Sequence, residues 1–461
     1  MKLSLQFDKG TILVFGAEKK QLQYLESLMW DERTNCFRAP ATEYRNIVTN
    51  LRKHKITYHD NARKFSAQIF PLKKDIKPRS FQSEAADAWI LEKRGVVTLP
   101  TGAGKTILAV ILIAKTGRPT LIHVPTIDLM GQWNSVLNEY FDIKIGLLGG
   151  GINDIQLITV ATYDSALLHV SYLGNQFGLQ VFDECHHLPG EQYKFTALGS
   201  IAPFRLGLTA TPERSDGKEK LLYQLCGPLC YETHIDELSG TTLAPYIVKT
   251  IEVEMLKDDR EQYEKSRKFY TDFLVKARIS FKHPNGWSNF LRKTTESNEG
   301  KEAFKAYLKQ KKLSQASEAK EELLWELIIN HKGDQILVFT QDNEMAYRMG
   351  SKFYLPVLTH HTKLAEREAF LKAFRTGEYS VLITSKVLNE GIDVPEANVG
   401  VIVSGSGSIR EHVQRLGRIL RARPGKQALL YELVSKGTGE YFTNQRRRQH
   451  RAYEGPALLQ D

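Results

Sequence analysis

The sequence predicts an α/β protein with two parallel sheets, and three observations support this fold class. Apolar, β-branched runs alternate with helical stretches in two separate sets along the chain. A glycine-rich segment, LPTGAGKT at residues 99–106, follows one such run and opens a helix. Two adjacent carboxylates, in VFDECH at residues 181–186, end another run. Because parallel sheets bind ligands at the carboxyl ends of their strands, both motifs indicate where a site lies.

Each set of expected strands consists of apolar runs bounded by polar or turn residues. The first set is expected at residues 96–99, 120–125, 157–162, 180–184 and 205–211. The second set is expected at residues 335–340, 354–359, 381–385, 399–405 and 429–434. Helices are expected at residues 107–114 and 127–140, among others. Ahead of both sets, alternating apolar residues at 3–7 and 11–15 predict a small hairpin, followed by a helix at 41–54.

The segment 99–106 predicts a site for a nucleoside triphosphate. Gly102 and Gly104 let backbone N–H groups converge on a phosphate, and the following helix adds the positive end of its dipole. Lys105 is expected to reach the β- and γ-phosphates, and the Thr106 hydroxyl is expected to bind Mg²⁺. The expected loop contacts are Pro100, Thr101, Gly102, Ala103, Gly104, Lys105 and Thr106. The plain alternative is a glycine-rich turn with an incidental lysine.

One residue departs from the usual phosphate-loop pattern. Leu99 stands where that pattern has glycine, but Pro100 and Gly102 can shape the turn.

Asp183 and Glu184 are the predicted hydrolytic carboxylates. Asp183 is expected to hold Mg²⁺, directly or through water, and Glu184 to polarise the water that attacks the γ-phosphorus. Two adjacent carboxylates repel each other unless a cation lies nearby. A solvated loop is the plain alternative, and the apolar run before the pair argues against it. The chain is therefore predicted to hydrolyse a nucleoside triphosphate.

The order of the sequence blocks resembles that of a superfamily 2 helicase, and within it the XPB (xeroderma pigmentosum group B) type of DNA translocase. The blocks are PRSFQ at 78–82, LPTGAGKT at 99–106, VPTIDLMGQW at 124–133, TYDSA at 162–166, FDECHHLP at 182–189, APFRLGLTATPER at 202–214, ILVFT at 336–340, ITSKVLNEGIDVPEANVGV at 383–401 and QRLGRILR at 414–421. Many separated blocks in the right order make the resemblance specific.

The resemblance implies two RecA-like domains, a helical thumb insertion and a small α+β N-terminal domain. The implied ranges are 1–72 for a domain similar to a damage-recognition domain, 73–235 for the ATP-binding helicase domain, 236–322 for a linker and basic thumb, and 323–461 for the second helicase domain with a basic tail.

The resemblance also assigns roles around the nucleotide. Gln82 is implied to read adenine, since an amide can donate and accept along a purine edge; the cofactors are therefore ATP and Mg²⁺. Thr209, Thr211 and His187 are implied to couple the γ-phosphate to domain movement, although a structural role for His187 stays open.

The second domain is implied to complete the ATP site. Gly391 and Asp393 would face the nucleotide, and Arg418 and Arg421 would act as arginine fingers, with Gln414 one turn earlier on the same side. Arginines three apart share one helix face, and such a guanidinium is worth about 10³–10⁵ in rate in related NTPases. A solvated basic helix is the alternative for the arginines.

The charge balance favours a polyanionic partner. The net charge is +10, and phosphate contacts supply most non-specific affinity for nucleic acid. Basic residues and aromatics interleave at 257–320, where XPB-type proteins have a thumb that grips duplex DNA. An amphipathic helical hairpin with its aromatics packed inward is the alternative, and the two are compatible.

By resemblance, a nucleic-acid strand lies along both helicase domains. The implied contacts are Pro125, Thr126, Gln132, Trp133, Thr162, Tyr163, Arg214, Asp216, Thr340, Thr384 and Ser385. Trp133 could equally belong to the core. The family's arginine–glutamate–aspartate signature here has Ser215 in place of its middle acid, a departure that bears on whether strands are opened.

The predicted NTP site and the family resemblance together indicate an ATP-driven DNA translocase. The resemblance implies that it moves 3′ to 5′ and has a role in repair or transcription-linked remodelling. Its expected partners are single-stranded and duplex DNA, and a partner nuclease or repair factor. A motor subunit for a nuclease, an RNA-stimulated helicase and a nucleic-acid binding switch are the alternatives. Four cysteines do not make a disulfide scaffold, and no apolar run approaches the ~20 residues of a membrane span; we expect a cytoplasmic protein without a membrane partner.

Overall fold

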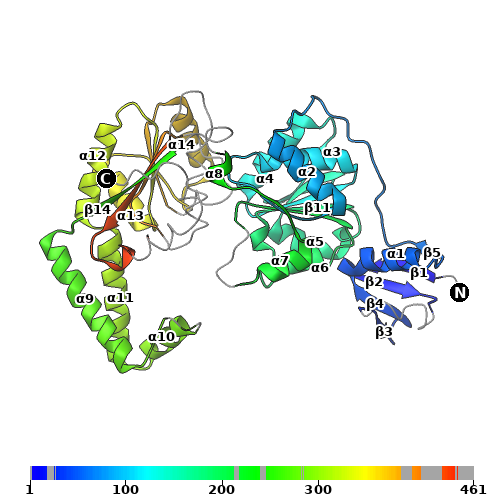
Figure 1. Cartoon of the computed structure of the whole chain (residues 1–461), viewed down its shortest axis with the longest axis horizontal. Helices are drawn as coiled ribbons and strands as arrows, with labels where there is room; N and C mark the ends of the chain where they lie inside the picture. The colour runs from blue at the N-terminus through cyan, green and yellow to red at the C-terminus, as the bar shows by residue number, and fades with distance from the viewer. Residues whose placement is uncertain are drawn as a thin grey trace. The chain divides into compact units, whose positions relative to one another are not determined.

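The computed structural model describes residues 3–17, 25, 27–211, 217–238, 246–281, 283, 285–385, 397–405, 428–441 and 444. The chain divides into two units. The first comprises Met1–His234 and Glu390–Asp393, and the second comprises Ile235–Asn389 and Val394–Asp461. Each unit contains one largely parallel sheet with helices against it, as the sequence predicts (Figure 1).

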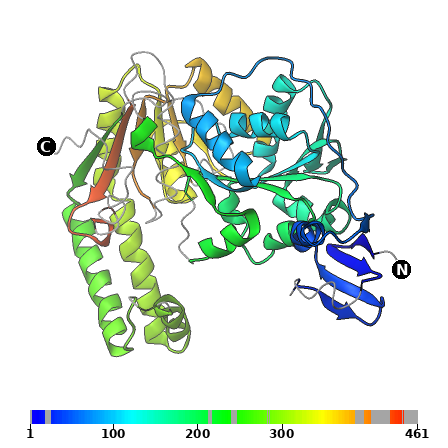
Figure 2. The ribbon, with the colours of Figure 1, turned by 45° about the vertical axis from the view of Figure 1, so that its right-hand side comes forward.

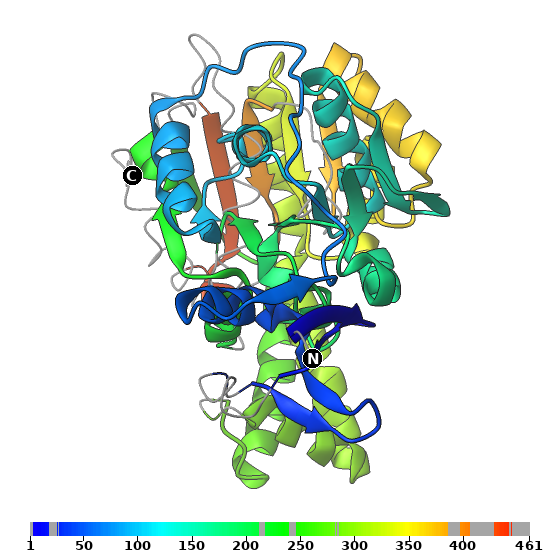
Figure 3. The ribbon, with the colours of Figure 1, turned by 90° about the vertical axis from the view of Figure 1, so that its right-hand side faces the viewer.

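A small sheet at the N-terminus belongs to the first unit, and its strand order is β3-β4-β2-β1-β5. Its strands are β1 (Leu3–Asp8), β2 (Thr11–Phe15), β3 (Met29–Asp31), β4 (Cys36–Pro40) and β5 (Tyr58–Asp60). The hairpin predicted for β1 and β2 is confirmed. The predicted helix begins as a 3₁₀ turn at Ala41–Glu43 and continues as α1 (Tyr44–Lys53), which lies against the small sheet (Figure 3). Ile47 and Leu51 of α1 are buried in the core that it shares with this sheet. This arrangement confirms the expected small α+β domain.

The main sheet of the first unit positions both predicted motifs. Its order is β13-β6-β12-β11-β7-β10-β8-β9, and all neighbours are parallel except β8 and β9. The strands are β6 (Arg94–Thr98), β7 (Thr120–Val124), β8 (Ile145–Gly149), β9 (Ile152–Asp154), β10 (Ile158–Thr162), β11 (Leu179–Asp183), β12 (Phe204–Thr209) and β13 (Leu229–Glu232). The sequence did not predict β8, β9 and β13, of which β9 and β13 are short and partly exposed.

Helices cover both faces of this sheet. Figure 1 shows α2, α3 and α4 on one face and α5, α6 and α7 on the other. Their bounds are α2 (Ser80–Glu92), α3 (Lys105–Thr116), α4 (Ile127–Tyr140), α5 (Tyr163–Leu173), α6 (Lys194–Leu198) and α7 (Glu219–Cys226). Strands β7, β10 and β11 are buried along their whole length, as strands covered on both faces must be.

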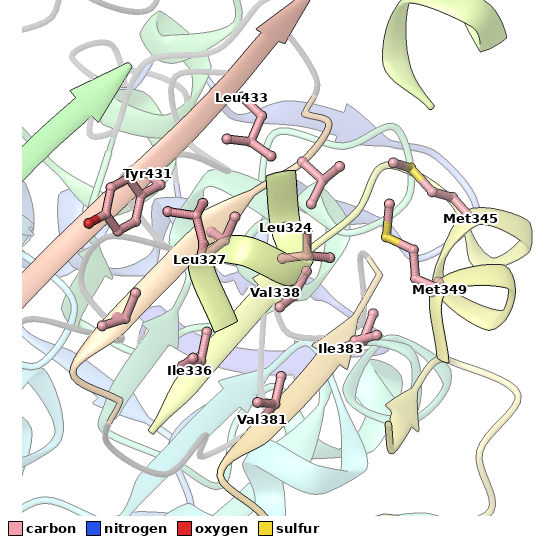
Figure 4. Close-up of a cluster of buried hydrophobic side chains, with 14 of the residues drawn as sticks. Leu324, Leu327, Ile336, Val338, Met345, Met349, Val381, Ile383, Tyr431 and Leu433 are labelled. Carbon is pink, nitrogen blue, oxygen red and sulfur yellow. The ribbon is translucent and has the colours of Figure 1, made fainter. Parts of the chain in front are cut away.

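The sheet of the second unit is parallel throughout, in the order β14-β19-β18-β15-β17-β16. Its strands are β14 (Tyr246–Val253), β15 (Ile336–Phe339), β16 (Val357–Leu358), β17 (Val381–Thr384), β18 (Val399–Ile402) and β19 (Ala428–Ser435). Its helices include α8 (Ile235–Leu238), α12 (Glu318–Asn330), α13 (Asn343–Phe353) and α14 (Leu364–Thr376). Figure 4 shows the apolar core, in which side chains of α12 and α13 pack on β15, β17 and β19.

Two strands of this sheet differ from the prediction. The strand expected at 354–359 shortens to β16, because Tyr354 ends α13 in the left-handed conformation. Strand β14 was not predicted, and it pairs with β19 from Tyr246 to Val253. It lies within the range expected to be only linker and thumb, so this range also contributes an edge strand to the sheet.

The predicted helical insertion follows β14 in the second unit. Helices α9 (Lys257–Lys276) and α11 (Asn298–Gln315) lie side by side, and α10 (Gly286–Thr295) packs near their far end (Figure 2). Phe273 and Phe290 form its core with the partly buried rings of Tyr270 and Tyr307. The alternative of inward-packed aromatics is therefore right for this cluster, and the helices' charged side chains remain outside it.

A buried ion pair fastens α12 to the sheet of the second unit. Lys320 Nζ lies 2.6 Å from Glu440 Oε2 and donates to Val403 O at 2.9 Å. Glu440 Oε2 also accepts from Ser435 N at 3.0 Å. Both charged side chains are almost fully buried, at 0% and 4% exposure. A pair this deep depends on both partners, because either charge alone would lack compensation.

We expect Lys320→Met to destabilise the second unit by about 3–5 kcal/mol, because the Glu440 carboxylate would then be buried without its partner. Urea unfolding, fitted to the transition of this unit, measures the change. Lys276→Met removes the exposed pair with Glu299 and should cost less than about 1 kcal/mol. Adding Glu440→Gln to Lys320→Met should recover part of the loss; equal effects of the two lysine variants would contradict this view of the pair.

Candidate nucleotide site

The loop between β6 and α3 has the backbone shape of a phosphate cradle. Gly102 and Gly104 have φ values of +85° and +86°, which other residues adopt only with strain. A Cβ atom on Gly104 would also lie 2.6 Å from Gln82 Nε2. Helix α3 begins at Lys105, directly after this turn. The loop therefore points backbone N–H groups and a helix N-terminus at one place, as the sequence predicts.

The structure shows why Leu99 can stand where the usual phosphate-loop pattern has glycine. Its side chain is fully buried, its φ is not positive, and its N–H donates to Thr209 O at 3.0 Å. The position thus joins the ends of β6 and β12 and needs no glycine.

Lys105 lies between the loop and the acidic pair. Its Nζ donates to Leu99 O at 3.4 Å and lies 3.9 Å from Glu184 Oε1. The structure therefore brings together the predicted phosphate lysine and the predicted general base, which are far apart in the sequence.

Asp183 ends β11 and is almost fully buried, at 5% exposure. Its Oδ1 accepts from Glu184 N at 3.0 Å, and its Oδ2 accepts from Trp133 Nε1 at 2.7 Å. Burial and the neighbouring Glu184 raise the pKa of Asp183 to about 6, and Lys105 acts in the opposite direction. A cation beside the Asp183 carboxylate would offset both the burial of its charge and its repulsion by Glu184.

The described residues fit a nucleoside triphosphate with a divalent metal. Thr101 Oγ1 and Glu184 Oε2 are buried without a hydrogen-bond partner, which suits a site that receives a polar ligand. The hydroxyl of Thr106 and the carboxylate of Asp183 are hard oxygen donors of the kind Mg²⁺ prefers. Because Mg²⁺ retains water and phosphate ligands, two protein donors suffice.

Gln82 contacts the loop in this structure. Its Oε1 accepts from Arg79 N at 3.0 Å, and its Nε2 donates to Ala103 O and Gly104 O, each at 3.2 Å. The amide thus supports the cradle, while its role in reading adenine stays a prediction.

His186 was missed by the sequence analysis as a link in this site. Its Nδ1 lies 3.5 Å from Glu184 Oε2 and 3.3 Å from Thr209 Oγ1. Thr209 Oγ1 in turn donates to Thr211 O at 2.9 Å. The ring of His187, the histidine chosen from the sequence, lies beside that of His186 with centroids 4.3 Å apart and planes tilted by 37°. The signal that could have singled out His186 is its position two residues after Glu184 at a strand end.

Most residues expected to contact nucleic acid have buried side chains. Those exposed by 7% or less are Trp133, Thr162, Tyr163, Thr340, Thr384 and Ser385. Side chains buried to this extent offer little surface to a nucleic acid in this structure, and the contacts expected of these residues stay predictions. Trp133 is buried in the core, as its alternative interpretation has it. Pro125, Thr126 and Gln132 keep partial exposure.

The hydroxyls of these threonines and of Ser385 have structural partners. Thr126 and Thr162 cap α4 and α5 by accepting from Leu129 N and Ser165 N, each at 3.2 Å. In the second unit, Thr340 Oγ1 donates to Asp342 O at 3.0 Å. Ser385 Oγ donates to Asn343 Oδ1 at 2.6 Å. These groups shape the starts of helices at the carboxyl ends of strands.

Several predicted site residues lie outside the described residues. They are Arg214, Ser215, Asp216, Gly391, Asp393, Gln414, Arg418 and Arg421.

Comparison with known proteins identifies the family. The model of the xeroderma pigmentosum group B helicase damage recognition domain matches residues 5–62, that of the type III restriction enzyme res subunit matches 75–214, and that of the ERCC3/RAD25/XPB C-terminal helicase matches 289–457. The DNA 3′-5′ translocase XPB2 of Sulfurisphaera tokodaii is 40% identical over 446 residues, which cover 96% of this chain and 99% of that protein. The chain belongs to the XPB family of helicases.

One further relative supports the family assignment, and one solved structure bears on the fold alone. The DNA 3′-5′ helicase XPB of Mycobacterium tuberculosis is 29% identical, over 96% of this XPB-family chain and 73% of that protein. The crystal structure of the Pyrococcus furiosus Hef helicase domain superposes with a TM-score of 0.53 at 20% identity, covering 81% of this chain and 98% of that one. The second comparison concerns the fold, and it confirms the predicted pair of RecA-like domains. Within the described part of this XPB-family chain, no helix is both long and apolar enough to cross a bilayer.

His123 on β7 gives this region of the XPB-family chain a pH-dependent stability. Its ring stacks on Phe182, next to Asp183, with centroids 4.5 Å apart. Burial, reinforced by the charge of Arg205, lowers the pKa of His123 to about 3. The unfolded chain binds this proton near pH 6.5, so the folded state loses stability as pH falls from there toward 3.

We expect His123→Asn to flatten this pH dependence. Each pH unit between about 6 and 4 should remove up to ~1.4 kcal/mol from the wild type and correspondingly less from the variant. Urea unfolding of the first unit at pH 7, 6 and 5 measures the slopes. His59→Asn, which replaces an exposed histidine of the same unit, is the control. If the free energy of unfolding changed equally with pH in the wild type and in His123→Asn, His123 would not be the source of the pH dependence.

Proposed function

We propose that this XPB-family chain is an ATP-dependent DNA translocase that moves 3′ to 5′ and remodels DNA. The observation that carries the proposal is the convergence of Lys105, Asp183 and Glu184 beside a glycine cradle. The names of its relatives, a DNA 3′-5′ translocase and a DNA 3′-5′ helicase, support the polarity and the substrate.

The hydrolytic step follows from the positions of these side chains. Lys105 and the loop N–H groups would bind and orient the phosphates, and Thr106 and Asp183 would hold the metal. Mg²⁺, when bound, neutralises charge that develops on the transferring phosphoryl group. Glu184, whose Oε2 has no hydrogen-bond partner in the described residues, accepts a proton from the attacking water.

The second helicase domain completes the proposed site. Arg418 and Arg421 supply positive charge to the γ-phosphate, Gln414 supports them, and Gly391 and Asp393 face the nucleotide. Gln82 turns its amide to adenine when ATP is bound, which requires it to release part of its present contacts with the loop.

DNA contacts in the proposal come from helix starts and the basic insertion. The N-termini of α4 and α5 offer backbone N–H groups to phosphates, with Pro125, Thr126 and Gln132 at the exposed rim. Arg214 and Asp216 belong to the same proposed track. Helices α9 and α11 present lysines to a duplex. A nuclease or repair factor as partner, a role in repair or transcription, and a cytoplasmic location remain parts of the proposal.

We expect Glu184→Gln to reduce ATP turnover about 10²–10⁴-fold, because it removes the general base and keeps the shape of the side chain. Binding of a fluorescent ATP analogue should stay near the wild-type level. Turnover is measured with single-stranded DNA, duplex DNA and RNA as stimulators, and Glu191→Gln, an exposed acid of the same unit, is the control. Normal turnover by Glu184→Gln would remove that residue from the mechanism. Stimulation by RNA alone would replace the DNA proposal with an RNA-stimulated helicase.

A further inference from the structure

Two buried aromatic side chains, from two different helices, direct their polar atoms at Asp183. Trp133, on α4, donates its indole N–H to Asp183 Oδ2 at 2.7 Å. Tyr163, the first residue of α5, donates its hydroxyl to Asp183 O at 3.0 Å. Each ring is 1% exposed. The residue expected to hold the metal is thus bonded from both sides by the helices that follow β7 and β10.

The hydrogen bonds from Glu184 N and Trp133 Nε1 to the side-chain oxygens fix the direction of the Asp183 carboxylate, and the bond from Tyr163 holds its main chain. Oδ1 accepts from Glu184 N and Oδ2 accepts from Trp133, so each oxygen has one protein donor and keeps lone-pair capacity for a metal ion. A hydrogen bond to a charged acceptor is roughly twice as strong as a neutral one, and a buried site strengthens it further. Partners of this kind orient a metal ligand and tune its affinity.

The same two helices begin with capping threonines, of which Thr126 is partly exposed and Thr162 is buried. Thr126 caps α4 and Thr162 caps α5, each immediately after the carboxyl end of a strand. Trp133 lies seven residues after Thr126, which is two turns along one face and about 10 Å along the axis. A rigid helix therefore joins a phosphate-binding end to the indole that holds Asp183. In α5 the capping residue, Thr162, and the residue that donates to Asp183, Tyr163, are adjacent in the sequence.

We propose that Trp133 and Tyr163 are positioning residues that transmit DNA contact at the starts of α4 and α5 to the metal-binding carboxylate of Asp183. The inference rests on the proposed function, and it assigns to two buried side chains the coupling between strand binding and hydrolysis. A strand that moves either helix changes the direction from which Asp183 receives its hydrogen bonds. Packing alone would need the rings and not their N–H and O–H groups.

The chain offers a matched control for this distinction. Trp89 on α2 is also fully buried in the first unit, and its Nε1 donates to Arg205 O at 3.0 Å. Trp89→Phe and Trp133→Phe each remove one buried indole hydrogen bond from the same unit, but Trp89 donates to a main-chain carbonyl and only Trp133 donates to the Asp183 carboxylate.

The test uses the full chain with Trp133→Phe, Tyr163→Phe and Trp89→Phe. Two quantities are measured: the ratio of ATP turnover with and without single-stranded DNA at saturating ATP, and the Mg²⁺ concentration that half-saturates the Mg²⁺-dependent binding of a fluorescent ADP. The second readout involves no turnover. Fluorescent ADP binding in EDTA reports nucleotide affinity without metal.

We expect Trp133→Phe to raise the half-saturating Mg²⁺ concentration about tenfold and to lower DNA stimulation by a similar factor. Tyr163→Phe, which loses a neutral bond to the main chain, should shift both in the same direction by about threefold. Metal-free ADP binding should be unchanged in both variants. Trp89→Phe should match the wild type in all three measurements.

The inference would be overturned if Trp133→Phe had the Mg²⁺ half-saturation and the DNA stimulation of the wild type. It would also be overturned if Trp89→Phe changed both quantities as much as Trp133→Phe does. If Trp133→Phe fails to fold, Tyr163→Phe provides the test. A higher half-saturating Mg²⁺ concentration and a lower DNA stimulation in that variant would support the inference, and wild-type values would overturn it. A wild-type protein that no DNA stimulates would overturn the proposed function and the DNA coupling with it. A wild-type protein that DNA stimulates, with no change in either variant, would overturn the inference alone.

Discussion

Two adjacent carboxylates at the buried end of β11 require positive charge, and this electrostatic constraint organises the first unit. Asp183 and Glu184 repel each other, and burial adds to the cost of their charges. Lys105 meets part of the need from 3.9 Å away. A divalent metal would meet the remainder, and Lys105 and the α3 N-terminus would hold the negatively charged phosphates. The fold thus keeps in place a cluster of charge that is incomplete without its ligand.

Strand β12 connects the two halves of this charge cluster, because it lies between β6 and β11 in the sheet. Thr209 at its end accepts from Leu99 N through its carbonyl oxygen and lies within reach of His186 through its hydroxyl. Thr209 is therefore connected both to the phosphate loop, through Leu99, and to Glu184, through His186. The hydrogen bonds of Thr209 with Thr211 extend this connection into the segment that the family resemblance assigns to coupling.

The sequence predicted the site residues whose roles follow from their immediate neighbours in the chain. It failed for residues whose roles depend on which way a helix or turn directs the side chain. Lys105 and Asp183 follow buried strands within a few residues, so their roles can be inferred from neighbouring residues. The partner of Trp133 lies 50 positions away in the sequence, and periodicity alone did not show which face of α4 meets β11. A 3₁₀ turn at Cys185–His187 decides which histidine faces Glu184. Edge strand β14 escaped prediction because Lys249 and Glu252 interrupt its apolar pattern.

The hydroxyls that cap α4 and α5 have a consequence for how such a protein would bind DNA. Thr126 and Thr162 accept hydrogen bonds from their own helices, and Thr162 Oγ1 also donates to Ser165 Oγ. What α4 and α5 can offer a strand is therefore mainly backbone N–H groups and the positive ends of helix dipoles. These groups bind phosphates and carry no information about bases. A motor that moves along DNA of any sequence needs contacts of this kind, and the burial of the expected side-chain contacts thus agrees with translocation.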